Sequence, residues 1–359
     1  MERRYILLVR LFSPITIKGK QIRNRIVMPP MVLFGKAGQN GFVTERHIKH
    51  YEERARGGTG LIIVEATCVQ EDGKLSPDQL GIWSDKHIEG LNKIAEACHK
   101  HGATVLIQLH HAGLKTHPKV SAVPSTPWKP NGKEGQFHVL SEDDINMILN
   151  NFIEAARRAK KAGFDGVELH GAHGYLLNQF VSPVVNQRED KYGGSLKNRM
   201  HLSMDIIKLI QEELGREFIV GYRMGANDPT LEDSIKIAKL LEESGVDILH
   251  ISTGISSENW TSPDVPKSFP LNWIVFSGTQ IKKHVSVPVI VVNGIRTPVQ
   301  ASWLVENKLA DFVAVGRGML ADPFWAEKAV AKSEVKPCLE CSKCLWFTNG
   351  DLCPQQKPD

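Results

Sequence analysis

The sequence has no run of about 20 consecutive apolar residues, which is the length that a membrane-spanning helix needs. It also has little excess charge, because 44 Lys and Arg face 40 Asp and Glu, and a formal charge of +4 is too slight for a nucleic-acid-binding surface. The apolar stretch 5–12 is a poor secretion signal, since Arg10 interrupts it and no small-residue cleavage site follows. We therefore expect a cytoplasmic protein that contacts neither membranes nor nucleic acid.

Cysteine is scarce over most of the chain. Only Cys68 and Cys98 of the six cysteines precede residue 338, and the other four crowd the last stretch. A secreted scaffold held together by disulfides is short and spreads its cysteines along its length, so this class is excluded. With 42% hydrophobic residues, the 359-residue chain can instead bury a large core, in one large domain or two ordinary ones.

The glycine-rich turn G-x-G-x-x-G, which usually follows the first strand of an open doubly wound sheet, is also missing. The first apolar run ends instead in Pro29-Pro30. What repeats along the chain is an apolar run, a polar loop and a helical stretch. The eight apolar runs are 25–28, 60–65, 104–109, 166–170, 218–223, 248–252, 289–292 and 312–315. Because each run is continuous rather than alternating in polarity, we predict fully buried parallel strands.

Helical stretches separate these strands. Three long helices are predicted over 145–162, 196–214 and 231–244. Ser141 and three acidic residues form a capping-box pattern before the first helix, and a glycine follows each of the three as a stop signal. Strands that alternate with helices predict an α/β protein, a (β/α)₈ TIM barrel followed by a short cysteine-rich tail. An open doubly wound sheet is the alternative.

Polar side chains collect where the predicted strands end. In barrels of this class the active site lies at the carboxyl ends of the strands. There the sequence places Pro29-Pro30, Glu65-Ala66, Gln108, His170, Arg223, Ser252, Asn293-Gly294 and Gly316-Arg317. Such a set of polar, cationic and glycine residues suits a planar polar ligand that lies across the barrel mouth.

The densest signal lies in the segment 168–178, where His170 and His173 stand three residues apart and Tyr175 follows. Two converging imidazoles could donate hydrogen bonds to a carbonyl oxygen, and a phenol beside them could supply a proton. The His-x-x-His spacing is also typical of a metal site, and Glu65 would then complete the ligands of a hydrolase or lyase. Structural histidines beside a packed tyrosine fit the same spacing.

Longer motifs run along residues 11–330. The most specific is Tyr192-Gly-Gly-Ser-Leu-Lys-Asn-Arg199, and others lie at 24–31, 60–67, 108–113, 168–183, 292–295 and 315–317. Together they resemble the Old Yellow Enzyme family of FMN-dependent ene-reductases, the NADH:flavin oxidoreductase / NADH oxidase type. The resemblance implies an N-terminal extension (1–10), an FMN-binding barrel (11–330) and a cysteine-rich tail (331–359).

The resemblance implies where the flavin ring of FMN would lie. Its edge would be lined by Pro29, Pro30, Met31 and Ala66. Gln108 would bond the pyrimidine end, and Arg223 would sit beside N1 and the C2 carbonyl, where a cation stabilises the anionic reduced flavin. From the residues alone, Arg223 could instead pair with Asp228, and Gln108 could satisfy a backbone group at the barrel rim.

The resemblance likewise implies sites for the phosphate and the substrate. The phosphate would be held after the seventh and eighth strands by Asn293, Gly294, Gly316 and Arg317. Taken without the family, the two glycines could equally be plain turn residues. His170 and His173 would grip the substrate carbonyl, and Tyr175 would be the proton donor.

We therefore predict an FMN oxidoreductase that uses NADH or NADPH to reduce activated C=C bonds in enones, enoates or enoyl compounds. Hydride would pass from flavin N5 to Cβ, and Tyr175 would protonate Cα. Its partners would be the nicotinamide nucleotide and a small activated alkene, and assembly into a homo-oligomer is open. The alternatives are an amine dehydrogenase or demethylase of the same family, the metal-dependent hydrolase or lyase, and an electron-transfer subunit.

The tail Cys338-x₂-Cys341-x₂-Cys344-x₈-Cys353 is predicted to bind a [4Fe–4S] cluster, because four thiolates within sixteen residues satisfy its coordination. Zinc, which also accepts Cys-x₂-Cys pairs, is the alternative. The tail resembles the subgroup with 2,4-dienoyl-CoA reductase and trimethylamine dehydrogenase, although its cysteines are more tightly spaced. We expect a chain without that subgroup's C-terminal nucleotide-binding domains.

Two departures from the family bear on the assignment. Val32 stands where family members often place Thr or Cys near the flavin C4 carbonyl. Ser256-Ser257-Glu258 occupies the region where dienoyl-CoA reductases carry a second catalytic histidine. The second departure weakens the dienoyl-CoA assignment but leaves the general one in place.

Overall fold

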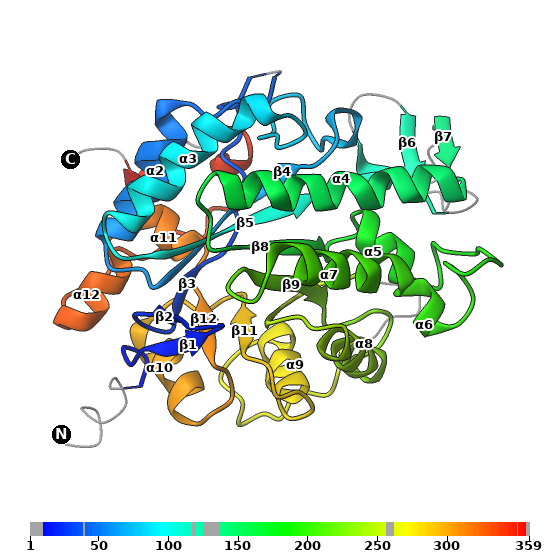
Figure 1. Ribbon diagram of the computed structural model, residues 1–359. Coiled ribbons are helices and arrows are strands. Elements are labelled where there is room, and N and C mark those ends of the chain that lie inside the picture. The colour runs from blue at the N-terminus through cyan, green and yellow to red at the C-terminus, as the bar shows by residue number, and fades with distance from the viewer. Residues whose placement is uncertain are drawn as a thin grey trace.

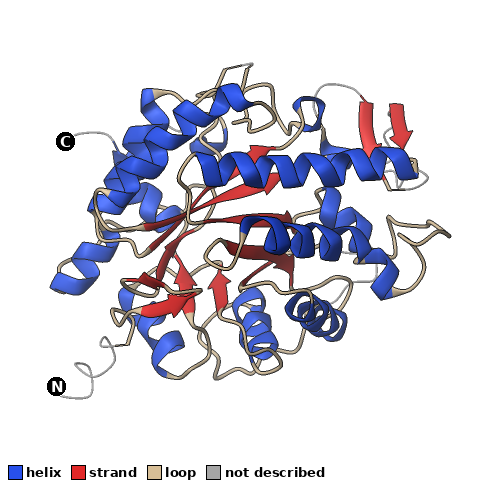
Figure 2. Cartoon of the chain, in the orientation of Figure 1, coloured by secondary structure: helices blue, strands red, loops and turns tan. Residues whose placement is uncertain are grey.

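The computed structural model describes residues 10–38, 40–116, 120–124, 136–255, 262–349 and 351–356. Eight parallel strands close into a barrel with helices around it, which confirms the predicted (β/α)₈ fold (Figures 1 and 2). In barrel order the strands are β3 (Ile26–Met28), β4 (Leu61–Cys68), β5 (Thr104–His110), β8 (Gly166–Gly171), β9 (Ile219–Gly225), β10 (Ile248–Ser252), β11 (Val289–Val292) and β12 (Phe312–Ala314). All eight predicted runs form strands, with shifts of a few residues at their ends. The segment 256–258, singled out above, lies outside the described residues.

The helices cover the outside of the barrel. They are α2 (Glu45–Arg56), α3 (Ile88–His99), α4 (Glu142–Lys161), α5 (Leu176–Val181), α6 (Leu196–Arg199), α7 (His201–Leu214), α8 (Leu231–Glu243), α9 (Trp273–Lys282), α10 (Pro298–Glu306), α11 (Arg317–Ala321) and α12 (Trp325–Ala331). Ser141 Oγ accepts the backbone N–H of Asp144, so the predicted cap of α4 is confirmed.

The prediction of one continuous helix over 196–214 was wrong. The chain forms α6 and α7 there, and Met200 ends the first and begins the second. The Arg199 side chain donates from Nε to the Val181 carbonyl at 2.7 Å and so ties this point to α5. That contact joins residues distant in sequence, which a helical pattern does not encode.

The barrel interior is apolar at its amino end. Side chains from β3, β4, β5, β9, β10, β11 and β12 meet there in one buried cluster. The antiparallel hairpin of β1 (Ile15–Ile17) and β2 (Lys20–Ile22) covers this end, because Ile17 and Ile22 belong to the same cluster. In Figure 1 the hairpin lies at one end of the barrel, and the small sheet of β6 (Val120–Val123) and β7 (Gln136–Val139) lies far from it. A ligand therefore reaches the interior from the carboxyl end.

Toward the carboxyl end the interior becomes polar. Gln108, Glu168, Arg223 and His250 come from four different strands, and none is more than 7% exposed. Buried polar groups need hydrogen-bond partners, so a layer of this kind is kept only where its members bond one another or a ligand. The layer lies directly below the cavities of the candidate site.

The cysteine-rich tail packs onto the barrel beside the loop that follows β3. Trp346 is 3% exposed, and its indole N–H donates to the Val32 carbonyl at 2.8 Å. The ring packs with Leu33 and Leu320 in a small apolar cluster. Within the described ranges, no helix is long and apolar enough to cross a membrane.

Candidate active site

Two adjoining cavities of about 330 and 260 Å³ open at the carboxyl ends of the strands, and we call them the first and the second cavity. Their walls share Pro30, Met31, His173, Arg223, Arg317 and Phe347. Together they are lined by every residue predicted for the cofactor and the substrate: Pro29, Pro30, Met31, Ala66, Gln108, His170, His173, Tyr175, Arg223, Asn293, Gly294, Gly316 and Arg317. The proximity of these residues is a structural finding, whereas their individual roles stay predictions.

Backbone shapes the far end of the first cavity. Asn293 and Gly294 follow β11 with positive φ angles of 98° and 69°. Asn272 fixes this turn by donating from its amide nitrogen to the Asn293 carbonyl at 3.0 Å. A Cβ on Gly294 would lie 2.9 Å from that nitrogen, and one on Gly316 would lie 3.4 Å from the nearest side chain. The turn at Gly294 therefore requires glycine, whereas a Cβ on Gly316 would make only an ordinary contact.

Arg223 is a buried cation that is only partly paired. Its Nη2 donates to Ser252 Oγ at 3.3 Å, while Nε is buried with no partner in the described part of the chain. Burial lowers the pKa of Arg223 and the nearby Glu168 carboxylate opposes this shift, so the guanidinium stays charged at neutral pH. The alternative pairing with Asp228 is not formed, because that carboxylate accepts from the Asn178 amide at 2.9 Å. A cation in this state needs a ligand with carbonyl or anionic groups.

The Glu65 side chain bonds groups other than His170 and His173. The register between β4 and β5 shifts between Val64 and Thr67, and the Glu65 carboxylate accepts from the Leu33 N–H at 2.9 Å and the Tyr51 hydroxyl at 3.1 Å. Burial raises the pKa of Glu65 to about 8. In the ranges that the structure describes, no three His, Cys, Asp or Glu side chains are grouped to hold a metal ion. The hydrolase or lyase hypothesis thus lacks its third ligand, and Glu65 anchors the loop after β3.

The two predicted histidines contact each other at the end of β8. His170 Nε2 and His173 Nδ1 are 3.0 Å apart, and His173 Nε2 bonds Ser252 Oγ at 2.7 Å. Burial, and after it the neighbouring charges that include Arg223, hold the pKa of both imidazoles well below the usual range. Both rings are therefore neutral at pH 7. A carbonyl ligand would meet neutral N–H donors and would replace one hydrogen bond of this chain.

The backbone of His173 is held in an unusual conformation. Its φ angle is +61°, in the left-handed region that few residues other than glycine adopt. Its N–H donates to the Thr253 carbonyl at 2.9 Å, and its own carbonyl accepts from Lys115 Nζ at 2.6 Å. Strained residues of this kind persist where contacts on both sides fix them, and they cluster at functional sites.

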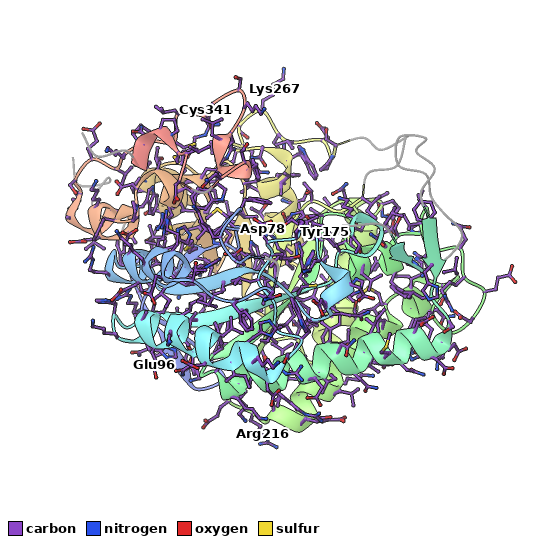
Figure 3. All side chains as sticks on the ribbon, turned by 90° about the horizontal axis from the view of Figure 1, so that it is seen from above. Asp78, Glu96, Tyr175, Arg216, Lys267 and Cys341 are labelled. Carbon is purple, nitrogen blue, oxygen red and sulfur yellow. The ribbon has the colours of Figure 1, made fainter. Side chains whose placement is uncertain are left out.

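Tyr175 stands immediately before α5, with its ring against two histidines. Ring centroids of His110 and His170 lie 4.5 and 4.8 Å from that of Tyr175, and Lys115 Nζ lies 5.1 Å from its centre. Burial raises the pKa of the Tyr175 phenol, so the group is protonated at neutral pH, as a proton donor must be. In Figure 3 Tyr175 lies toward the middle of the molecule, and Cys341 of the tail lies near its edge.

Sequence reasoning missed the polar layer beneath the site. Gln108 Nε2 donates to Glu168 Oε1 at 2.7 Å, so its alternative backbone partner is not observed, and His250 Nδ1 bonds Glu168 Oε2 at 2.8 Å. It also missed His110, whose Nδ1 bonds Gln79 Nε2 at 3.0 Å. A signal existed for Glu168 and His250, because a carboxylate and an imidazole inside apolar strands are rarely buried unless paired.

The tail forms one wall of the site. All four tail cysteines and Arg317 line a third, small cavity of about 30 Å³, which we call the cysteine cavity. Cys338 also borders the first cavity and Cys344 the second. Phe347 lines both of these larger cavities and packs edge-on against Phe34, with ring centroids 6.0 Å apart. The spacing of the cysteines alone does not reveal this contact.

Fold and site together define the class: a TIM-barrel oxidoreductase whose open end is built for a flavin. Residues 10–335 match the model of the NADH:flavin oxidoreductase / NADH oxidase family, and the chain belongs to that family. The predicted family and enzyme class are thereby confirmed.

Three known proteins illustrate the similarity. The NADH oxidase of Thermoanaerobacter brockii is 43% identical over 344 residues, which cover 92% of this chain and 52% of that protein, so the chain spans about half its length. The NADPH dehydrogenase of Halalkalibacterium halodurans is 39% identical over 331 residues, covering 89% of this chain and 94% of that protein. The solved structure of an Old Yellow Enzyme homologue from Zymomonas mobilis superposes with a TM-score of 0.79 at 27% identity, over 97% of this chain and 99% of that one.

Proposed function

We propose that the chain is an FMN-dependent oxidoreductase that uses NADH or NADPH to reduce C=C bonds conjugated to a carbonyl group. The observation that carries the proposal is the convergence of His170, His173 and Tyr175 with Arg223 on one cavity. Relatives named NADH oxidase and NADPH dehydrogenase support a nicotinamide nucleotide as the reductant. An amine dehydrogenase ranks below this proposal, because amine oxidation has no use for a pair of imidazoles that bind a carbonyl.

The residues of the two cavities fit FMN. Arg223 offers a guanidinium nitrogen without a partner among the described residues, and Gln108 offers an amide oxygen. These groups would hold the pyrimidine edge of the ring, and Arg317 and the glycine turn at Gly294 would hold the phosphate. When bound, FMN supplies the site that takes up and releases hydride.

The side chains of the second cavity would act on the substrate. The imidazoles of His170 and His173 donate hydrogen bonds to the substrate carbonyl oxygen and stabilise the negative charge that develops on it. The Tyr175 phenol gives its proton to the carbon next to that carbonyl. The charge of Arg223, which opposes the rise in the pKa of the phenol, stabilises the phenolate that remains.

The released cofactor should be FMN rather than FAD. The turn after β11 and the start of α11 line one end of the first cavity, where barrels of this class bind a single phosphate. Mass spectrometry of the cofactor freed by denaturation tests this directly. Stoichiometric FMN supports the assignment, and FAD or an unrelated cofactor would overturn it.

His170→Ala should weaken the binding of phenols, which place an oxygen where the substrate carbonyl would lie. Losing one hydrogen bond to a ligand oxygen costs about 1 kcal/mol or more, which corresponds to roughly tenfold in affinity. Titration of the long-wavelength charge-transfer band that phenols form with bound flavin gives the dissociation constant. His99→Ala is the control, because it removes an imidazole that bonds Asp165 at the amino end of the barrel, away from the cavities. A wild-type protein that forms no such band would remove the support for the histidine pair.

We also propose that Cys338, Cys341, Cys344 and Cys353 bind a [4Fe–4S] cluster, with zinc as the alternative metal. The supporting observation is that all four border the cysteine cavity. In the described ranges their thiols are not grouped as a metal site, so the cluster would have to draw them together. The protein purified under strict anaerobiosis should contain iron and sulfide in equal amounts, and Cys341→Ser should lower both. Stoichiometric zinc without sulfide would show a zinc site in place of the cluster. If neither iron nor zinc were present, the cysteines would not form a metal site.

The division into an extension (1–10), the barrel (11–330) and the tail (331–359) is part of the same proposal. Its support is that the family match and the last barrel helix, α12, both end close to residue 331. A cytoplasmic location is proposed on the cysteine usage, since four of the six cysteines crowd one stretch and are not spread along the chain as in a secreted disulfide scaffold.

A further inference from the structure

A buried carboxylate holds two hydrogen bonds in the middle of the barrel. Glu168 is 1% exposed, and its two oxygens accept from Gln108 Nε2 at 2.7 Å and from His250 Nδ1 at 2.8 Å. The three residues lie on β5, β8 and β10. Gln108 and Glu168 are direct neighbours in the register of β5 and β8. The contact is therefore built into the sheet and does not depend on loops.

The hydrogen-bonding roles in this group follow from the carboxylate. A carboxylate only accepts, so the amide nitrogen of Gln108 must face Glu168 and the amide oxygen must point elsewhere. The same reasoning places a proton on His250 Nδ1. His250 Nε2 then carries only a lone pair, in keeping with its having no partner in the described chain. Burial, with the charge of Arg223, lowers the pKa of His250, so the ring is neutral.

Arg223 lies level with His250 and two residues nearer the barrel mouth than Glu168. On β9 the register partner of Glu168 is Gly221, and Arg223 follows two residues later on the same face of the strand. His250 on β10 is the register partner of Arg223 itself. The field of the Glu168 carboxylate supports the charged form of Arg223.

We propose that the Glu168–His250 pair sets the charge and the orientation of the pyrimidine end of the flavin site. Resting on the FMN site proposed above, the inference assigns two tasks to Glu168. It fixes Gln108 so that its amide oxygen accepts an N–H of the ring, and it offsets part of the positive charge of Arg223. His250 is a positioning residue that holds the carboxylate in place.

The charge offset predicts a direction for the flavin midpoint potential. Reduction adds negative charge to the flavin, and a carboxylate behind Arg223 opposes that change. In Glu168→Gln the opposition disappears, so the equilibrium should shift toward reduced flavin by about tenfold, which is about 30 mV for a two-electron couple. The amide that replaces the carboxylate can donate to the Gln108 oxygen, and the Gln108 nitrogen would then face the flavin ring. FMN should therefore bind about tenfold more weakly, which corresponds to the loss of about one hydrogen bond.

The chain offers a matched control on the same strand segment. Asp165 precedes β8 at the amino end of the barrel, and its carboxylate also bonds an imidazole, that of His99, at 2.8 Å. Asp165→Asn also neutralises a carboxylate that bonds an imidazole, although Asp165 is paired with Lys20 as well. Asp165 lies about 10 Å further from the mouth than Glu168, at about 3.3 Å per residue. The midpoint potential and FMN affinity of this variant should match those of the wild type.

A second pair of variants covers the case in which Glu168→Gln does not fold. His250→Gln keeps an amide N–H that can donate to Glu168. His250→Leu removes this donor, so the negative charge of the Glu168 carboxylate is compensated less and acts more strongly on the flavin. The potential of His250→Leu should therefore move in the direction opposite to that of Glu168→Gln, and His250→Gln should stay near the wild type.

The measurement is anaerobic spectroelectrochemical titration of the FMN-loaded protein, together with fluorescence titration of apoprotein with FMN. A raised potential in Glu168→Gln and a lowered one in His250→Leu, with Asp165→Asn unchanged, would support the inference. Equal potentials in Glu168→Gln, His250→Leu and the wild type would overturn it while leaving the proposed function intact. A wild-type chain that binds no FMN would instead overturn the proposed function itself.

Discussion

Tyr175→Phe slows the reoxidation of the reduced protein by an enone about 10²–10⁴-fold, the usual effect of losing a positioned general acid. The ring remains, so its edge contacts with His110 and His170 and its place before α5 are kept. Only the phenolic proton is lost. Reduction of the flavin by the nicotinamide nucleotide needs no proton from Tyr175 and stays within a few-fold of the wild-type rate.

Stopped-flow measurement of the two half-reactions separates these effects. Tyr222→Phe serves as the control, because its hydroxyl is also buried but bonds Ser203 Oγ at 2.9 Å, inside the barrel wall. If Tyr175→Phe slowed both half-reactions equally, Tyr175 would be a structural residue and the proton would come from another group.

Arg223→Met lowers the affinity for FMN by roughly 30-fold to several thousand-fold. This range corresponds to about 2–5 kcal/mol, the cost of truncating one partner of a buried charge pair. Methionine fills similar space but leaves the Glu168 carboxylate without a nearby cation and the pyrimidine end of the ring without its positive neighbour. The potential of whatever flavin remains bound should also fall, because negative charge on the reduced ring is no longer stabilised.

Titration of apoprotein with FMN, followed by quenching of flavin fluorescence, gives this affinity. Arg25→Met is the matched control, since Arg25 is a buried guanidinium, 9% exposed, that bonds the Asp311 carbonyl at the amino end of the barrel. Similar FMN affinities for the two variants would mean that Arg223 acts through general stability and does not contact the cofactor.

The barrel could be predicted from the sequence because its strands are buried on both faces. Continuous runs such as those ending in His170 and Ser252 have no other stable place than the inside of a helix-covered sheet. The location of the site could also be predicted, because the carboxyl ends of all eight parallel strands lie at the same end of the barrel. The break at Met200 was not predicted, and beside it Arg199 bonds the Val181 carbonyl of α5, a contact that the local sequence pattern does not encode.

The residues that line the site could be predicted from the sequence, whereas the contacts between them could not. His170 and His173 were expected to bond a ligand, and the structure shows that they bond each other and that His173 also bonds Ser252. The role of the tail as a wall depends on Trp346 reaching the Val32 carbonyl, more than 300 residues earlier in the chain. Such long-range pairs leave no periodic trace in the sequence, and only the packed structure brings them together.

We propose that this barrel passes hydride from a nicotinamide nucleotide, through bound FMN, to an activated alkene. Anaerobic titration of the purified yellow protein, first with NADH or NADPH and then with an enone, tests it most directly. At least one nicotinamide should bleach the flavin absorbance, and the enone should restore it with stoichiometric loss of the C=C bond. A flavin that is reduced by neither nucleotide, or that no enone, enoate or enoyl thioester reoxidises, would contradict this function.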